Sequence, residues 1–222
     1  LSNAPAVFQR LMNNVLGTLK NSIAFPYIDD VIIPCPNTAE GLERLRQVLK
    51  VLRKNGLTLK LEKCRFFQKK IDYLGREITV EGIKPGVRKV QAVLEMKEPQ
   101  TIKEVRQFLG LSGYFRRHVE NYARIVEPLT RLLRKDVPWS WKSEQQEAFE
   151  TVKKVLTERP VLAVYNPDLE TELHTDASSL GFGAILLQRH DEMFRVVAYY
   201  SKQTPPEQKC NHSYEQETLA VV

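Results

Sequence analysis

Two neighbouring carboxylates, Asp29 and Asp30, lie in a short segment that could carry out metal-dependent chemistry. The run Tyr27-Ile28-Asp29-Asp30 is flanked by apolar, β-prone residues, and a turn there would direct both side chains toward one point. Carboxylate oxygens are the ligands that Mg²⁺ prefers, and two such ions bridged by carboxylates and phosphates perform in-line phosphoryl or nucleotidyl transfer. The alternative is a solvated turn, which is the ordinary role of an Asp-Asp pair.

A second acidic group lies near the C-terminal end of the chain. Asp176 ends a strand-like run and precedes a turn rich in small residues, and Glu215 and Glu217 lie near the start of a helical pattern. An aspartate in such a place often forms a turn, and glutamates in a first helical turn are favoured by the helix dipole. Residue type alone leaves both metal binding and local structure open.

The elements that must position the first acidic pair follow from hydrophobic periodicity. Apolar residues at helical spacing predict a helix over 6–19, and the β-rich run 23–33 predicts a hairpin with the acidic pair at its tip. A capping-box pattern predicts a helix over 37–55. Alternation then predicts strands over 57–61 and 65–79. Strands that return after a helix indicate an α+β domain.

The rest of the chain changes from a basic helical region to a strand-rich region. Proline opens or ends several of the predicted helices. The predicted elements are helices over 85–94, from 101 onward and over 143–158, strands over 173–176, 183–188 and 195–201, and a last helix from about 213. A strand-rich second domain is therefore expected from about residue 165.

Composition limits the classes of protein to consider. The chain has 222 residues, and 42% hydrophobic content is enough to bury cores, which excludes a disordered tail. It carries 33 Lys plus Arg against 27 Asp plus Glu, and this net charge of +6 favours a polyanionic partner, although a mild excess also serves solubility. Three separated cysteines without a CxxC pair indicate a reduced intracellular protein without structural zinc. No bilayer-length apolar run or signal sequence is present, so we expect no membrane association.

The order of motifs resembles the Pol polyprotein of gypsy-type LTR retrotransposons. Residues 27–30 resemble the Y-x-D-D signature of reverse transcriptases, and 1–9 resemble the segment after the nucleotide-binding residue. The run 66–78, with Tyr-Leu-Gly at its centre, is similar to the primer-grip hairpin. Residues 108–117 resemble the thumb signature, and 160–162 the approach to RNase H. The resemblance covers essentially the whole chain.

This resemblance implies a multidomain α+β and α/β fold. We expect a partial reverse transcriptase palm over 1–82, including the primer-grip-like hairpin, and a helical thumb over 83–137. A connection or tether is expected over 138–165, and the first half of an RNase H-like domain with a mixed sheet over 166–222. The chain starts with Leu1 instead of Met and stops within an apolar helical pattern, so we expect both ends to continue in a longer polyprotein.

The resemblance also implies which carboxylates bind metal. Asp29 and Asp30 would hold Mg²⁺ for polymerisation, with Asp29 the preferred direct ligand and a third aspartate upstream of this chain. Asp176 would be the first RNase H ligand, and Glu217 is preferred over Glu215 because a short apolar helical segment follows it. Two-metal sites with Mg²⁺ are expected, with Mn²⁺ as an alternative. Two further RNase H aspartates would lie downstream.

Further residues are implied to contact nucleic acid. They belong to the Y-x-D-D signature, the segment before it, the primer-grip-like hairpin and the thumb-like helices. These residues are Gln9, Tyr27, Tyr73, Leu74, Gly75, Arg116 and Arg117. The implied partners are RNA template, DNA primer, RNA/DNA hybrid, dNTPs and the rest of Pol, including protease and integrase.

The function implied is RNA-directed DNA polymerase with RNase H activity. We expect this portion alone to be inactive, because each site holds only part of its ligand set. The expected location is the cytoplasm, in virus-like particles or free, with access to the nucleus and without secretion. The alternative is a domesticated or decayed remnant that binds nucleic acid without catalysis, although the retained carboxylates argue against decay. A generic basic DNA-binding protein would need a compact recognition helix, and no clean pattern for one is found.

Overall fold

The computed structural model describes residues 2–221 and divides into two units, with the boundary between Gln68 and Lys69. The domain boundaries expected near residues 82, 137 and 165 remain predictions. Within residues 2–221, no helix combines the length and the apolar character that a bilayer crossing requires.

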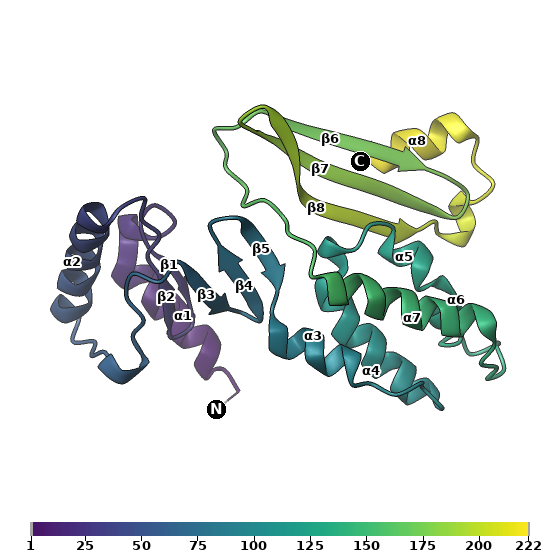
Figure 1. The fold of residues 1–222 in the computed structure, drawn as a ribbon, viewed down its shortest axis with the longest axis horizontal. Helices are drawn as coiled ribbons and strands as arrows, with labels where there is room; N and C mark the ends of the chain where they lie inside the picture. Colours follow the sequence, from purple (N-terminus) through teal and green to yellow (C-terminus); the bar gives the residue numbers. More distant parts are fainter. Residues whose placement is uncertain (1, 222) are drawn as a thin grey trace. The chain divides into compact units, whose positions relative to one another are not determined.

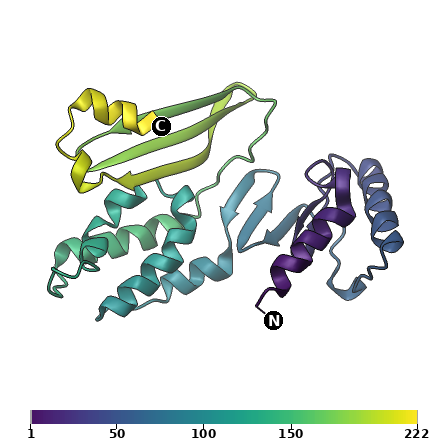
Figure 2. The ribbon, with the colours of Figure 1, turned by 180° about the vertical axis from the view of Figure 1, so that it is seen from behind.

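The first unit contains two helices that pack against each other (Figure 2). Helix α1 spans Ala4–Leu16 and has proline in its first turn, where a missing N–H costs nothing. Helix α2 spans Thr38–Lys54, and the Asn37 side chain accepts a hydrogen bond from the Glu40 amide at 2.9 Å. Both predicted helices are confirmed. The buried apolar side chains between them are Met12, Leu16, Ala24, Val48 and Leu52.

A two-stranded hairpin follows α1 and carries the acidic pair. Strand β1 spans Phe25–Tyr27 and β2 spans Asp30–Ile32, with Tyr27 paired to Asp30. The reversal is made by Ile28 and Asp29, and Ile28 adopts φ +52°. The predicted hairpin is confirmed, with the acidic pair at its tip.

The strand predicted over 57–61 is wrong. These residues form irregular chain that ends in a 3₁₀ helix, Leu61–Lys63. Leu57 packs against the core of the unit, whereas Leu59 and Leu61 are exposed. Alternating leucines form a strand only when a neighbouring strand supplies hydrogen bonds, and β1 and β2 pair only with each other in the described chain.

The second unit opens with a three-stranded antiparallel sheet in the order β3-β4-β5. Strand β3 spans Lys70–Tyr73, β4 spans Arg76–Thr79 and β5 spans Gly82–Pro85. The run predicted as strand over 65–79 is therefore a hairpin that reverses at Leu74-Gly75 and begins later than expected.

Pro85 does not open a helix, as the sequence pattern predicted, but ends β5. It lies opposite Arg76 on an edge strand, where a residue without an N–H is tolerated. Helix α3 begins two residues later and spans Val87–Leu94. Sequence analysis did not predict β5, because its four residues show no clear alternation.

A helical core follows the sheet. Helix α4 spans Ile102–Ser112 and starts at Thr101, whose side chain accepts from the Glu104 amide at 3.3 Å, as the capping pattern predicted. Short helices α5 (Tyr122–Ile125) and α6 (Glu127–Arg131) lead to α7 (Ser143–Glu158). The largest fully buried apolar side chains are Phe108, Phe115, Leu129, Phe149 and Leu156. Burial of each contributes about 2 kcal/mol, so this core holds the unit together.

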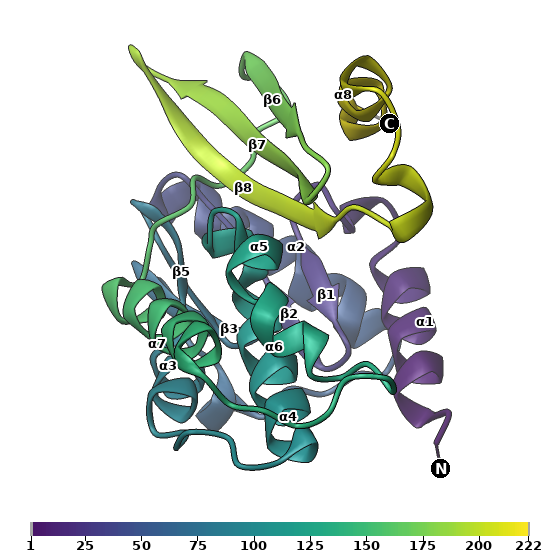
Figure 3. The same ribbon diagram turned by 90° about the vertical axis from the view of Figure 1, so that its right-hand side faces the viewer.

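The last sheet is antiparallel in the order β6-β7-β8. Strand β6 spans Thr171–Ala177, β7 spans Gly181–His190 and β8 spans Met193–Gln203. All three predicted strands are confirmed and are longer than expected. Helix α5 packs against β8, and helix α8 (Ser213–Val221) packs against β6 (Figures 1 and 3). The predicted last helix is also confirmed, and the chain has the mixed helix-and-sheet architecture that was expected.

Candidate catalytic and nucleic-acid-binding sites

One side chain of α1 holds the turn that carries Asp29 and Asp30. The Gln9 Oε1 atom accepts a hydrogen bond from the Ile28 amide at 2.6 Å, and its Nε2 atom donates to the Pro26 carbonyl at 3.4 Å. A β-branched residue with positive φ is strained and persists only where its surroundings fix it. The Gln9 side chain therefore stabilises the backbone from which both carboxylates project.

The two carboxylates are exposed and available to a ligand. Asp29 lies in the turn, Asp30 begins β2, and the side chain of Tyr27 beside them is 47% exposed. Exposed neighbouring carboxylates suit a hard divalent cation, which takes six or more oxygen ligands. Residues 2–221 contain no group of three His, Cys, Asp or Glu side chains arranged to hold a metal. Two carboxylates are fewer ligands than such a cation takes, so a site at Asp29 and Asp30 would need further ligands.

Asp176 lies at the end of β6 beside a cavity of about 210 Å³. Its backbone pairs with Gly183, which pairs with Ser201 of β8, so the three residues form a row across the sheet. The Ala123 amide of α5 donates to Ser201 Oγ at 2.8 Å and closes one side of the cavity. Arg124 is a basic residue on the same wall. The aspartate is exposed at this cavity and can meet solvent or substrate.

Glu217 projects from α8, which packs against the strand that carries Asp176. Glu215 and Glu217 are both exposed, so burial does not distinguish them. The structure brings the two elements together, while the choice of Glu217 over Glu215 stays a prediction. His174 lies 2.7 Å from the Glu172 carboxylate, which gives this histidine a local partner.

The second hairpin tip is held by several groups. Leu74 and Gly75 adopt φ +49° and +70°, the pattern of a two-residue hairpin turn. The Gly86 amide donates to the Gly75 carbonyl at 3.1 Å, and the Tyr114 hydroxyl donates to the Leu74 carbonyl. The Lys89 ammonium lies 3.6 Å from the centre of the Tyr114 ring, a favourable cation–π contact. This predicted nucleic-acid contact is thus fixed to α3 and to the chain after α4, and Tyr73 before it is half-buried.

Arg116 and Arg117 are exposed on a 3₁₀ helix, Gly113–His118. His118 from the same helix is buried, and its Nδ1 lies 3.2 Å from the Pro160 carbonyl oxygen. Burial lowers the pKa of His118 from 6.5 to about 4. The imidazole is therefore neutral at physiological pH, whereas the two arginines extend into solvent.

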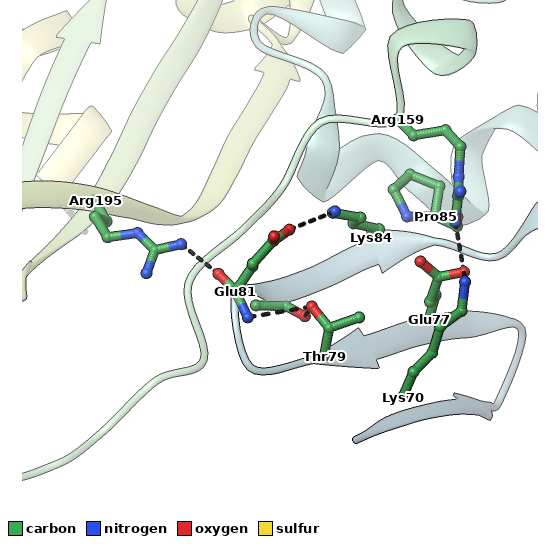
Figure 4. Close-up of polar contacts among 9 residues, drawn as sticks. Lys70, Glu77, Thr79, Glu81, Lys84, Pro85, Arg159 and Arg195 are labelled. Atoms are coloured by element: carbon green, nitrogen blue, oxygen red, sulfur yellow. Dashed lines mark hydrogen bonds and ion pairs between the residues drawn. The ribbon is translucent and has the colours of Figure 1, made fainter. Parts of the chain in front are cut away.

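A buried carboxylate near this hairpin was not predicted from the sequence. Glu77 of β4 has a side chain only 5% exposed and forms ion pairs with Lys70 at 2.7 Å and Arg159 at 3.0 Å (Figure 4). The neighbouring Lys70 ammonium lowers the Glu77 pKa most, burial opposes this shift, and Arg159 lowers the pKa further. Lys70 is itself exposed, so the carboxylate lies just beneath the surface. A glutamate inside a strand run was the available signal, but the sequence did not identify its distant partner.

Two family models match this chain. Residues 1–78 match the family described as reverse transcriptase (RNA-dependent DNA polymerase). Residues 141–222 match the RNase H-like domain found in reverse transcriptase. The Transposon Tf2-3 and Tf2-7 polyproteins of Schizosaccharomyces pombe are each 34% identical over 223 aligned residues, which cover 100% of this chain. The chain spans 17% of the length of these relatives.

Solved structures with a similar fold include two of the foamy viral protease-reverse transcriptase. The complex with dsDNA has a TM-score of 0.83 and 22% identity, and the match covers 100% of this chain and 46% of that chain. The complex with RNA/DNA hybrid has a TM-score of 0.82 and 21% identity, and the match covers 98% of this chain and 29% of that chain. At this level of identity, the likeness establishes the fold.

Proposed function

Since residues 1–78 belong to the reverse transcriptase family and residues 141–222 to the RNase H-like domains found in reverse transcriptases, we propose that this chain is a working part of a retrotransposon polyprotein. The larger protein copies element RNA into DNA and degrades the RNA strand of the hybrid. The chain contributes part of the polymerase site and part of the RNase H site. It also contributes the hairpin with the Leu74-Gly75 tip, which lies between the two sites in the sequence. The 34% sequence identity to transposon polyproteins, which extends over the full chain, supports this proposal.

The observation that carries the polymerase assignment is the held turn at Asp29-Asp30. Two exposed carboxylates project from a backbone that Gln9 fixes through the Ile28 amide. Bound Mg²⁺ would activate the attacking oxygen and neutralise charge on the phosphates. The role of the chain itself is to hold the two carboxylates at one point, and a preorganised position of this kind is worth several kcal/mol in the transition state.

The RNase H assignment is supported by the position of Asp176. It is exposed at a cavity whose other wall comes from α5, and α8, the helix that carries Glu217, packs against the same strand. Arg124 on the cavity wall and Lys202 on β8 are cations that can neutralise phosphates of a bound hybrid. We propose that Asp176 and Glu217 supply carboxylates for RNA cleavage.

The nucleic acid is proposed to run along the basic side chains and the second hairpin. Arg116 and Arg117 are exposed for phosphate contacts, and the fixed Leu74-Gly75 tip is suited to hold the primer end. Binding through phosphates weakens as salt concentration rises. We therefore expect salt-dependent affinity for RNA/DNA hybrid.

Primer extension on an RNA template with Mg²⁺ tests the polymerase assignment. The parent-length enzyme should extend the primer, and Asp29→Asn should reduce the rate by roughly 100-fold or more because a charged ligand is lost. Asp136→Asn is the matched control, since Asp136 is an exposed aspartate between α6 and α7, outside the proposed sites. Full activity in Asp29→Asn would overturn the assignment.

RNA cleavage assays with further variants test the RNase H assignment and distinguish an enzyme from a binding module. Asp176→Asn should abolish RNA cleavage and retain primer extension, and Asp168→Asn, an exposed residue before β6, is its control. Glu217→Gln should impair cleavage more than Glu215→Gln. A parent-length protein that lacks both activities but binds RNA/DNA hybrid in a salt-dependent way would instead support a binding module without catalysis.

A further inference from the structure

Arg159 follows α7 and attaches it to the sheet β3-β4-β5. It adopts φ +48°, and its guanidinium donates to the Pro85 carbonyl through Nε at 3.1 Å and Nη2 at 3.0 Å. The same Nη2 lies 3.0 Å from the Glu77 carboxylate (Figure 4). Only a planar guanidinium can donate to the Pro85 carbonyl of β5 through two nitrogens and pair with the Glu77 carboxylate of β4 at the same time.

The residues after Arg159 bond to two sheets in turn. Leu162 pairs with Ile83 of β5 through two hydrogen bonds of 2.7 and 2.9 Å. Its neighbour Ala163 donates its amide to the Val196 carbonyl of β8 at 2.7 Å. One extended stretch of two residues therefore connects the edge of the first sheet to an edge strand of the last sheet.

Two more features make this connection close. Gly82 adopts φ +139°, and a Cβ atom there would overlap the Leu162 carbonyl oxygen, so glycine allows the two backbones to meet. Arg195 of β8 donates to the Glu81 carbonyl at the turn between β4 and β5 (Figure 4). Side-chain and backbone contacts thus join the same two sheets at several independent points.

We propose that these contacts form a coupling junction that sets the register of RNA cleavage. Its residues are Glu77, Glu81, Ile83, Pro85, Arg159, Leu162, Ala163, Arg195 and Val196. The junction joins the hairpin whose Leu74-Gly75 tip is proposed to hold the primer end to the sheet that carries Asp176. Arg159 is a positioning residue that acts through this junction and does not contact the nucleic acid.

The path from Arg159 to the hairpin tip is short. Glu77 lies next to Arg76 on β4, and Arg76 begins the strand immediately after the tip. Loss of Arg159 leaves Glu77 with Lys70 alone and removes both donors from the Pro85 carbonyl. The separation between the tip and the last sheet is then fixed less firmly, because it depends on the backbone contacts of Leu162 and Ala163 and on Arg195 alone.

This inference rests on the proposed function, and its test separates the two. Parent-length enzyme is given an end-labelled RNA hybridised to a DNA primer with a defined 3′ end, and the positions of the RNA cuts are mapped. Successive phosphates of one strand are about 3.4 Å apart along double-stranded DNA, which sets the scale of a one-nucleotide shift. In Arg159→Met we therefore expect the main cut to move or spread by at least about one nucleotide, with the rate of primer extension within about threefold of the parent.

Arg189→Met is the matched control. Arg189 of β7 pairs with Glu170 at 3.3 Å in the last sheet, but both side chains are exposed and neither touches the junction. Its cuts should match those of the parent. Arg159→Lys keeps the charge beside Glu77 but cannot reproduce the planar contacts, so its pattern should lie between those of the parent and Arg159→Met.

Each outcome decides a separate point. An unchanged cut pattern in Arg159→Met, with extension intact, overturns the coupling inference. Proportional loss of extension and cleavage with an unchanged pattern also overturns it, because that result indicates only a structural role. If Arg159→Met does not fold, the double variant Glu77→Gln/Arg159→Met removes both charges and is mapped instead. A parent enzyme that neither extends nor cleaves contradicts the proposed function itself.

Discussion

The hairpin tips at Ile28-Asp29 and Leu74-Gly75 reverse the chain in two residues each, but they are supported differently. The first turn has a strained Ile28 and is held by Gln9 from α1. The second places Gly75 at φ +70° and is tied to Gly86, to Tyr114 and, through β4 and β5, to the coupling junction. Both tips are two-residue turns, but the first is held by one side chain and the second is held by several groups.

This difference matches the two proposed tasks. A catalytic pair must remain open to metal and nucleotide, so few groups can crowd it, and the turn depends on one side chain beneath it. A hairpin that holds a primer end needs a fixed position more than an open face. The comparison predicts that single substitutions disturb the first tip locally and that disturbance of the second requires damage to its supports.

The largest effect is expected at Gly82, where the junction is tightest. Gly82→Ala should lower the free energy of unfolding of the second unit by about 4 kcal/mol, because φ +139° is strained for alanine and its Cβ meets the Leu162 carbonyl. Trp139 and Trp141, the two tryptophans of the chain, both lie in this unit, so their fluorescence reports its unfolding. A loss under about 1 kcal/mol would show that the sheets are not held this closely.

His118 should make the second unit sensitive to acid. Its folded pKa of about 4 lies below the ordinary 6.5, so the unfolded chain takes up the proton first as pH falls. The contribution of His118 to the free energy of unfolding is fully present above pH 6.5. It falls by about 3 kcal/mol between pH 6.5 and 4 and does not change further below pH 4. The lowered pKa of Glu77 removes stability only below its ordinary 4.5.

The range from pH 6.5 to about pH 5 therefore isolates His118. Tryptophan-monitored urea unfolding should show a loss of about 1.5 kcal/mol in this range for the wild-type chain. His118→Gln cannot take up the proton and should show little change. The same slope in both proteins would contradict the assignment of this pH dependence to His118.

Gln9→Ala should loosen the first tip alone. The Ile28 amide loses its acceptor, which costs about 1.5 kcal/mol and raises its hydrogen-exchange rate about tenfold. Gln9→Glu should restore protection, because a carboxylate still accepts from this amide. If Gln9 instead acts by direct contact with nucleic acid, as the sequence predicted, both variants should weaken hybrid binding and the amide should stay protected.

The smallest effects are expected at the turn residues themselves. Gly75→Ala should cost about 1 kcal/mol for its positive φ, while the Lys89 side chain, 2.5 Å from the new Cβ, can move aside. Ile28→Gly should relieve strain and leave exchange at the first tip unchanged or slower. Tryptophan fluorescence measures the effect of Gly75→Ala, and amide exchange measures that of Ile28→Gly. If both substitutions are equally destabilising, the two turns do not differ in strain.

Local sequence determined much of the secondary structure. The capping pairs Asn37 with Glu40 and Thr101 with Glu104 form as their spacing predicted. The β-rich run around Asp29-Asp30 forms its hairpin, because the two strands that pair are adjacent in the sequence. The roles of the acidic residues in metal binding stay predictions, since local pattern places a carboxylate without showing what it binds.

Sequence patterns were wrong where a second element decides the outcome. Leucines at 57, 59 and 61 alternate like a strand but meet no neighbouring strand. Pro85 resembles a helix start but ends an edge strand, because Arg76 lies opposite it and the Gly86 amide bonds to Gly75. Periodicity cannot reveal whether a partner strand is present.

The sequence by itself determined the family and most of the helices and strands, because these depend on short motifs and local spacing. Only the tertiary structure decided that Glu77 would be buried against Arg159 and that Leu162 and Ala163 would join two sheets. A charged residue is ordinarily solvated, and its burial depends on whether packing brings an opposite charge to it. That pairing arises from the folded core, so no local pattern could have identified it.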